Sequence, residues 1–132
     1  MPVAQLGLIS LDCAEPTVLA AFWAALLGGE VVYRTDDVHI VHTERGVLAA
    51  LRVPDYTPPT WPNGPTPKHI HLDLRVEDLD IGEAAALALG ARLSDAQPGP
   101  DRWRVLLDPA GHPFCLTAHI PLLPLGPRAE ER

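Results

Sequence analysis

Apolar and polar residues alternate along most segments of the chain, and two segments instead show the three-and-four spacing of an amphipathic helix. In the first half, the pattern predicts a strand over residues 5–13 and then a helix that starts at Pro16 and stops at Gly28-Gly29. Three further strands are expected near residues 30–34, 38–43 and 47–53. The first half therefore has the predicted order βαβββ.

The second half repeats this order. Its first strand lies in KHIHLDLRVEDLD, from Lys68 to Asp80, and a helix follows with a carboxylate capping box at Asp80-x-x-Glu83 and a stop at Gly90. Short strands are expected at 91–93, 103–107 and 114–119.

The two halves can be superimposed along the sequence. Residues 13–16 fall on residues 76–79 at an offset of 63, and the glycine stops of the two helices align at an offset of 62. A two-copy repeat predicts a pseudo-symmetric α+β domain whose halves meet at a shared pocket. The predicted units are a domain over residues 1–119 with modules 5–53 and 68–119, a linker over 54–67 and an irregular tail over 120–132.

The linker contains six of the chain's fifteen prolines together with Tyr56 and Trp61, so it cannot be regular structure. A connection of this length inside a compact domain is often functional, and the two aromatic residues could close over a ligand. The alternative is that they pack the loop onto the protein surface.

The segment Lys68 to Asp80 carries the chemistry that the sequence offers most plainly. Read as a strand, it has Ile70, Leu72 and Leu74 on an apolar face and polar residues on the other. The polar face consists of His69, His71, Asp73 and Arg75. Imidazole and carboxylate groups at this spacing can share a ligand, a proton or a metal ion. The alternative is a face that simply meets water.

Composition limits the possible functions. The chain is 47% hydrophobic with a mean hydropathy of +0.08, which indicates a folded globule, and its apolar runs are too short to span a bilayer. A net charge of −7 without a basic cluster argues against nucleic acid or an anionic membrane as partner. The N-terminal segment has no basic signal-peptide region, so we expect a cytoplasmic protein with Cys13 and Cys115 as thiols.

The paired order, with the phrases LAAFWAALLGGEV, VPDYTPPTWP, HIHLDLRVEDLD, LALGARL and RWRVLLDPAGHPFCL, resembles the glyoxalase/bleomycin-resistance/dioxygenase (vicinal oxygen chelate) superfamily. It is most similar to the glyoxalase-like branch common in actinobacteria. The resemblance implies two βαβββ modules that form a cupped, mixed, eight-stranded sheet with helices on its outer face. It also implies a small-molecule ligand and a homodimer. It does not imply one reaction, because the superfamily includes enzymes and proteins that sequester antibiotics.

The metal-dependent members of the superfamily hold a divalent ion with one ligand from the first and one from the last strand of each module. The resemblance maps these positions onto Leu8, Ala49 or Ala50, His71 and Cys115. Leucine and alanine cannot coordinate a metal, so we expect the usual metal site to be absent and predict no cofactor. A relocated site built from His69, His71 and Asp73, with Cys115 as a further candidate, is the alternative.

These considerations predict a cup in which His71 and Asp73 act as a metal-independent acid–base pair in a lyase or isomerase type of reaction. The competing hypothesis is a protein that binds a ligand without turnover. The side chains expected to contact the ligand are His69, Leu8, Cys115, Thr117, Trp61, Tyr56 and Trp103.

Overall fold

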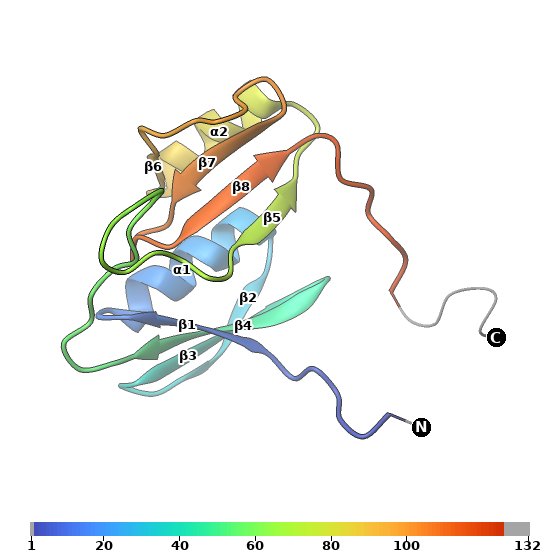
Figure 1. Cartoon of the computed structure of the whole chain (residues 1–132). Helices are drawn as coiled ribbons and strands as arrows, with labels where there is room; N and C mark the ends of the chain where they lie inside the picture. Colours follow the sequence, from blue (N-terminus) through green and yellow to red (C-terminus); the bar gives the residue numbers. More distant parts are fainter. Residues whose placement is uncertain (1, 126–132) are drawn as a thin grey trace.

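The computed structural model describes residues 2–125, and the predicted α+β fold of two βαβββ modules is confirmed (Figure 1). The first module consists of β1 (Ile9–Cys13), α1 (Pro16–Leu27), β2 (Glu30–Arg34), β3 (Val38–Thr43) and β4 (Gly46–Arg52). The second consists of β5 (Leu72–Arg75), α2 (Leu79–Leu89), β6 (Arg92–Leu93), β7 (Trp103–Leu107) and β8 (Pro113–Thr117). Residues 120–125 have no regular structure, and the rest of the predicted tail lies outside the described residues.

The eight strands form two four-stranded sheets with equivalent topologies. Their orders are β1-β4-β3-β2 and β5-β8-β7-β6. In each sheet the module's first strand pairs in parallel with its last strand, and the other pairs are antiparallel. Strands β1 and β5 are therefore equivalent edge strands, and they border the gap between the two modules.

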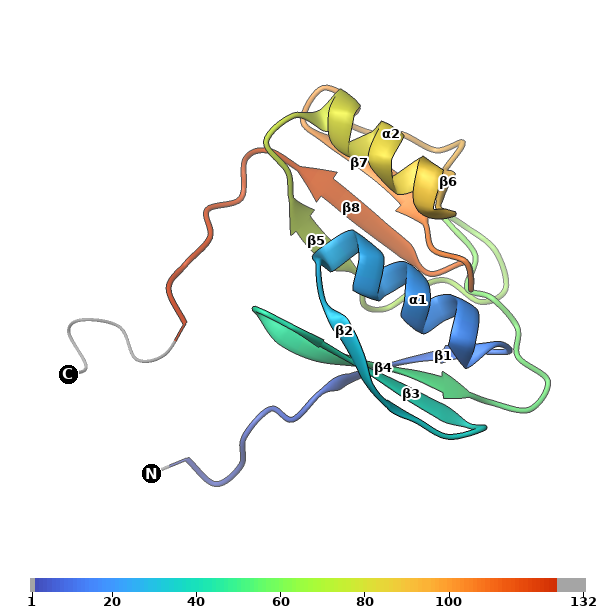
Figure 2. The ribbon, with the colours of Figure 1, turned by 180° about the vertical axis from the view of Figure 1, so that it is seen from behind.

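Helix α1 lies between the two sheets, and α2 covers the face of the second sheet that α1 also contacts (Figures 1 and 2). This central position explains why α1 is apolar around most of its surface. Its Trp23 ring lies 5.1 Å, centroid to centroid, from Phe114 of β8, in an edge-to-face arrangement. Both modules therefore share one core, which lies against the helix-covered faces of the two sheets.

Local signals explain where the helices begin and end. Pro16 occupies the first turn of α1, and Gly28 ends the helix in the left-handed conformation, with φ of 67°. For α2 the capping box predicted at Asp80 is wrong, because the N-cap lies two residues earlier, at Asp78. The Asp78 carboxylate accepts a hydrogen bond of 2.9 Å from the backbone N–H of Ile81.

Strand β5 is shorter than the segment Lys68 to Asp80 suggested, because its only ladder is with the five-residue β8. His69 and His71 lie in the chain that leads into it. Ile70 was assigned to the apolar face of the predicted strand, but it precedes β5 and is 81% exposed. Within residues 2–125, no helix has the length and apolar character needed to cross a membrane.

Candidate functional site

The face of the second sheet opposite the helices carries most of the predicted site residues. Strand register places Asp73 beside Cys115 and Thr117 beside Trp103, so these side chains share one face. The opposite face carries Phe114 and Leu116, which are buried against the helices. We call the side opposite the helices the second-sheet face; its strand residues are Asp73, Arg75, Trp103, Val105, Leu107, Cys115 and Thr117. His71 precedes β5 and contacts Asp73 there, whereas Val105 and Thr117 are buried.

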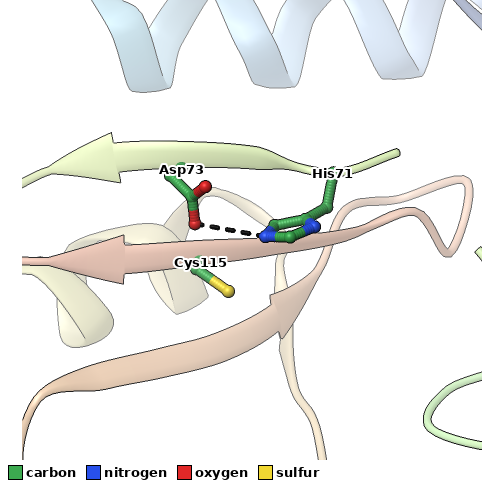
Figure 3. Close-up of side chains that lie close together, drawn as sticks. All are labelled: His71, Asp73 and Cys115. Carbon is green, nitrogen blue, oxygen red and sulfur yellow. Dashed lines mark ion pairs between the residues drawn. The ribbon is translucent and has the colours of Figure 1, made fainter. Parts of the chain in front are cut away.

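His71, Asp73 and Cys115 converge on this face (Figure 3). The Nε2 atom of His71 lies 3.3 Å from Oδ1 of Asp73, and one potential ligand atom from each of the three residues lies within 4.8 Å of the others. The side chains of His71 and Asp73 are 35% and 46% exposed, so solvent or a small molecule can reach them. The sequence prediction of His71 and Asp73 as neighbours is thus realised, and Cys115 joins them from the adjacent strand.

The environment of Cys115 keeps its thiol protonated at neutral pH. Burial raises the pKa of Cys115 to about 11, and the negative charge of Asp73 acts in the same direction. The positive charge of Lys68 opposes this shift without cancelling it. Because the thiolate is the reactive form, Cys115 is a poor nucleophile here.

Lys68 is the residue that sequence reasoning overlooked. Its ammonium group lies 4.2 Å from the centroid of the Trp61 ring, and its charge reaches Cys115. The indole N–H of Trp61 donates to the backbone oxygen of Ala96 at 3.5 Å, so the linker is tied to the loop that precedes β7. Lys68 is the single lysine of a chain with net charge −7 and directly precedes His69-Ile70-His71, and this is the signal that could have identified it.

Tyr56, the other linker aromatic, lies elsewhere. Its hydroxyl donates a 2.6 Å hydrogen bond to the backbone oxygen of Ala110 and lies 3.4 Å from Nε2 of His112. Burial raises the pKa of Tyr56, as expected for a phenol held in this position. Tyr56 lines a separate hollow of about 390 Å³ with Cys13 and Pro109, so the structure does not bring it together with His71 and Asp73.

An inter-module groove runs between strands β1 and β5. One wall is the segment 6–12 and the other is the segment 70–75, and α1 contributes Trp23 and Leu27 to its floor. The groove comprises hollows of about 580 Å³ and about 210 Å³, of which the first contains Asp73 and the second His71. The junction of the two halves is therefore hollow, as the repeat predicted.

The other residues that the sequence predicted to contact a ligand have different surroundings. Leu8 lines the larger hollow of the inter-module groove together with Asp73. Trp103 is covered by the preceding loop, since a side chain on Gly99 would meet its ring at 2.6 Å. Thr117 is 7% exposed, and its hydroxyl donates to the backbone oxygen of Arg102 at 3.2 Å. His69 is exposed, and it does not belong to the group formed by His71, Asp73 and Cys115.

The fold and the groove define a paired βαβββ protein with a hollow between its modules. The sequence model of the Glyoxalase-like domain matches residues 8–117, and the chain belongs to this family of the vicinal oxygen chelate superfamily. A comparison with curated protein sequences gives no match.

Solved structures share the fold. A glyoxalase-related enzyme from Fulvimarina pelagi is 20% identical over 87% of this chain and 88% of its own length, with a TM-score of 0.63. The fosfomycin resistance protein FosX from Listeria monocytogenes, in a complex with Mn(II), is 17% identical. The match covers 91% of this chain and 93% of FosX, with a TM-score of 0.67. A glyoxalase/bleomycin resistance protein/dioxygenase family enzyme from Burkholderia phytofirmans is 17% identical. The match covers 86% of this chain and 97% of that enzyme, with a TM-score of 0.65.

The residues of this chain do not fit the superfamily's four-ligand metal site. The resemblance assigns the two ligand positions of the first module to Leu8 and to Ala49 or Ala50, and Ala49 lies on β4 beside Ser10 of β1. Aliphatic side chains offer no donor atom, so the first module cannot supply its half of the coordination sphere. Only His71 and Cys115 retain donors at the corresponding positions of the second module.

Proposed function

We propose that this chain binds a small anionic carbonyl compound where the second-sheet face meets the inter-module groove. There it transfers a proton with His71 and Asp73, without the superfamily's metal. The observation that supports the proposal is the 3.3 Å contact between Nε2 of His71 and Oδ1 of Asp73 on an accessible surface. A paired imidazole and carboxylate can act as a general base and the group that orients it.

The contact implies which nitrogen of His71 does the chemistry. With Nε2 turned toward Asp73, a neutral His71 that keeps its proton on Nε2 has its lone pair on Nδ1. In Figure 3 the second ring nitrogen points away from Asp73, so it is free to take a proton from a substrate carbon next to a carbonyl. Asp73 then stabilises the imidazolium that forms. General acid–base catalysis of this kind contributes about 10²–10⁴-fold in rate.

The surroundings support a substrate with a negative group and an apolar part. Lys68 supplies a positive charge close to Cys115, and such a charge can hold a carboxylate or a similar anion. Leu8 and its neighbours in the inter-module groove provide apolar surface for the rest of the molecule. The neutral thiol of Cys115 would lie against the substrate without attacking it.

The second candidate function is binding without turnover, and the apolar character of the inter-module groove favours it. Its larger hollow is lined mostly by aliphatic residues of both modules, which suits an apolar ligand with no need for chemistry. A resistance function also occurs among the structural neighbours, since the FosX proteins are named as fosfomycin resistance proteins.

We also propose that the protein is a homodimer in the cytoplasm. Strands β1 and β5 each have a single partner strand, and nearby Leu6 and Ile70 are 85% and 81% exposed. A second copy could cover these edges. Both cysteines are free thiols, as is usual in a reducing compartment. Analytical ultracentrifugation tests the dimer, and a monomer at micromolar concentration would contradict it.

One experiment distinguishes the two candidate functions. Untagged protein in a chelating buffer is screened against small 2-oxo carboxylates for a ligand-induced thermal shift and for a chemical product. We expect a ligand that shifts the wild type and is turned over, with turnover lost in His71→Gln and Asp73→Asn while the thermal shift remains. A thermal shift that persists in all three proteins with no product would favour binding without catalysis.

A further inference from the structure

The segment that follows β8 borders the inter-module groove. It leaves the second module after residue 117, and Leu122 lines the larger hollow of the groove together with residues of the first module. Figures 1 and 2 show this segment running past β5 toward the first module. We propose that residues 120–123 form a strap that sets the length of the apolar chain the groove accepts, and that the ligand is a carboxylate with an unbranched alkyl chain longer than that of butanoate.

One hydrogen bond fastens the strap to the first module. The guanidinium group of Arg45, in the turn between β3 and β4, donates to the backbone oxygen of Leu123 at 2.6 Å. Pro121 and Pro124 flank the pair Leu122-Leu123. Proline fixes its own φ, so this segment loses less conformational entropy when it is held than a more flexible one would. The strap therefore crosses from one module to the other and can be held there by a single contact.

The hollow and the strap together offer apolar surface. The hollow has a volume of about 580 Å³, within the range of about 300–1,000 Å³ that is usual for ligand pockets. Aliphatic residues of both modules line it, and its charged lining residues balance in sign: Arg45, Arg75, Glu44 and Asp73. Leu122 lines the hollow and is still 58% exposed. An alkyl chain in the hollow covers this exposed part, which strengthens binding in proportion to the area covered.

The inference rests on the anionic ligand proposed above, which sets the direction of the chain. In that proposal Lys68 holds the carboxylate, and the charge of Lys68 acts on Cys115. Asp73 is the register partner of Cys115 and also lines the larger hollow. A chain that begins at Lys68 and passes Asp73 therefore enters the hollow that Leu122 borders. A short carboxylate ends before it reaches the strap.

The test is a calorimetric titration of the full chain, without a tag, with butanoate, hexanoate and octanoate. These saturated carboxylates lack the 2-oxo group, so binding is measured apart from any proton transfer. The wild type should bind more tightly by about fourfold for each added methylene. Leu122→Ala should weaken octanoate by about fivefold or more, and butanoate by less than about twofold.

A second variant tests the contact that holds the strap. Arg45→Ala removes the bond to Leu123 and also a positive charge at the hollow. Loss of the charge alone would weaken all three carboxylates by the same factor. Release of the strap instead lowers the gain in affinity per methylene, and this is the result that we expect. On octanoate, the effects of Arg45→Ala and Leu122→Ala should be less than additive, because both changes act on the same strap.

The matched control is Leu125→Ala, the same substitution three residues farther along the tail. Leu125 is 60% exposed and does not line the hollow, so this variant should bind all three carboxylates as the wild type does. Circular dichroism verifies that each variant is folded.

The proposal is overturned if the wild type binds octanoate no more tightly than butanoate, or if Leu122→Ala and Leu125→Ala have equal effects on octanoate. An equal loss for all three carboxylates in Arg45→Ala would also contradict the strap. None of these outcomes depends on turnover. A chain-length preference that is lost in Leu122→Ala supports the strap even where no proton transfer is found, so failure of the proposed catalysis and failure of this inference are separate results.

Discussion

Replacement of Asp108 should reveal how strongly the two modules are joined. Asp108 follows β7 and is fully buried. Its Oδ2 accepts a hydrogen bond of 3.0 Å from the indole N–H of Trp23, which lies 85 residues away in the first module. Its Oδ1 accepts bonds of 2.9 Å from the backbone N–H groups of Ala110 and His112. One carboxylate therefore fixes the turn before β8 and connects it to α1.

The expected cost follows from these three bonds. Asp108→Ala leaves three donors without their acceptor, at about 1.5–3 kcal/mol for each bond to a charged group. Removal of the buried charge relieves part of its desolvation cost, so the net loss should be about 3–5 kcal/mol. Asp108→Asn retains one oxygen for the two backbone donors but turns an N–H₂ group toward Trp23, so it should cost about 1–2 kcal/mol.

The pH dependence of the Asn variant gives a second check. Burial raises the pKa of Asp108 above its ordinary value, although the hydrogen bonds it accepts oppose the shift. A raised folded-state pKa stabilises the protein at low pH, and this contribution is lost as the pH rises through the folded-state value. The Asn variant has no such titration. The cost of Asp108→Asn should therefore be smaller at about pH 7 than at about pH 4.5.

Urea denaturation measures these free energies of unfolding. The matched control is Asp78→Ala, which removes a carboxylate that accepts a single backbone bond at an exposed helix N-cap and should cost about 1 kcal/mol. A cost for Asp108→Ala no greater than that of Asp78→Ala would refute the view that this carboxylate joins the modules. So would additive effects of Asp108→Asn and Trp23→Phe, because directly bonded partners should be coupled.

Three further predictions concern the site and the core. The alkylation rate of Cys115, separated from Cys13 by peptide mapping, should keep rising up to about pH 11, and a plateau below pH 9.0 would contradict the protonated thiol. Lys68→Gln should weaken an anionic ligand about fivefold, or about 1 kcal/mol, measured by calorimetry, with unchanged affinity as the opposing result. Gly29→Ala should lower the free energy of unfolding in urea by about 1–3 kcal/mol, because its Cβ would press on the backbone oxygen of His42. Gly7→Ala, which adds a Cβ in open space, should cost much less, and equal costs for the two variants would argue against this packing.

The parity of strand residues could be predicted from the sequence, and this was enough to expect His71 and Asp73 of the candidate site to be neighbours. Because side chains alternate with a period of two, His71 and Asp73 had to share a face. The repeat indicated that β5 and β8 are the first and last strands of one module, which placed Cys115 on the neighbouring strand. The register that sets Cys115 beside Asp73 needed the structure.

Contacts between distant loops could not be predicted in the same way. Tyr56 and Trp61 lie in one proline-rich linker, yet the first bonds the turn before β8 and the second bonds the loop before β7. Local pattern cannot choose between these partners, because it contains no information on how the loops meet. Asp108 illustrates the same limit: the sequence identifies it as a turn residue, whereas its bond to Trp23 depends on the packing of α1 between the sheets.

We propose that His71 and Asp73 move a proton without a metal, and hydrogen–deuterium exchange measures this proton transfer directly. A bound 2-oxo carboxylate is incubated with untagged protein in deuterated, chelating buffer, and loss of the proton next to its carbonyl is followed by NMR. We predict exchange by the wild type that falls by about 10²-fold or more in His71→Gln and less in Asp73→Asn, with His42→Gln unchanged. Exchange that survives His71→Gln, or that requires an added divalent ion, would contradict the account.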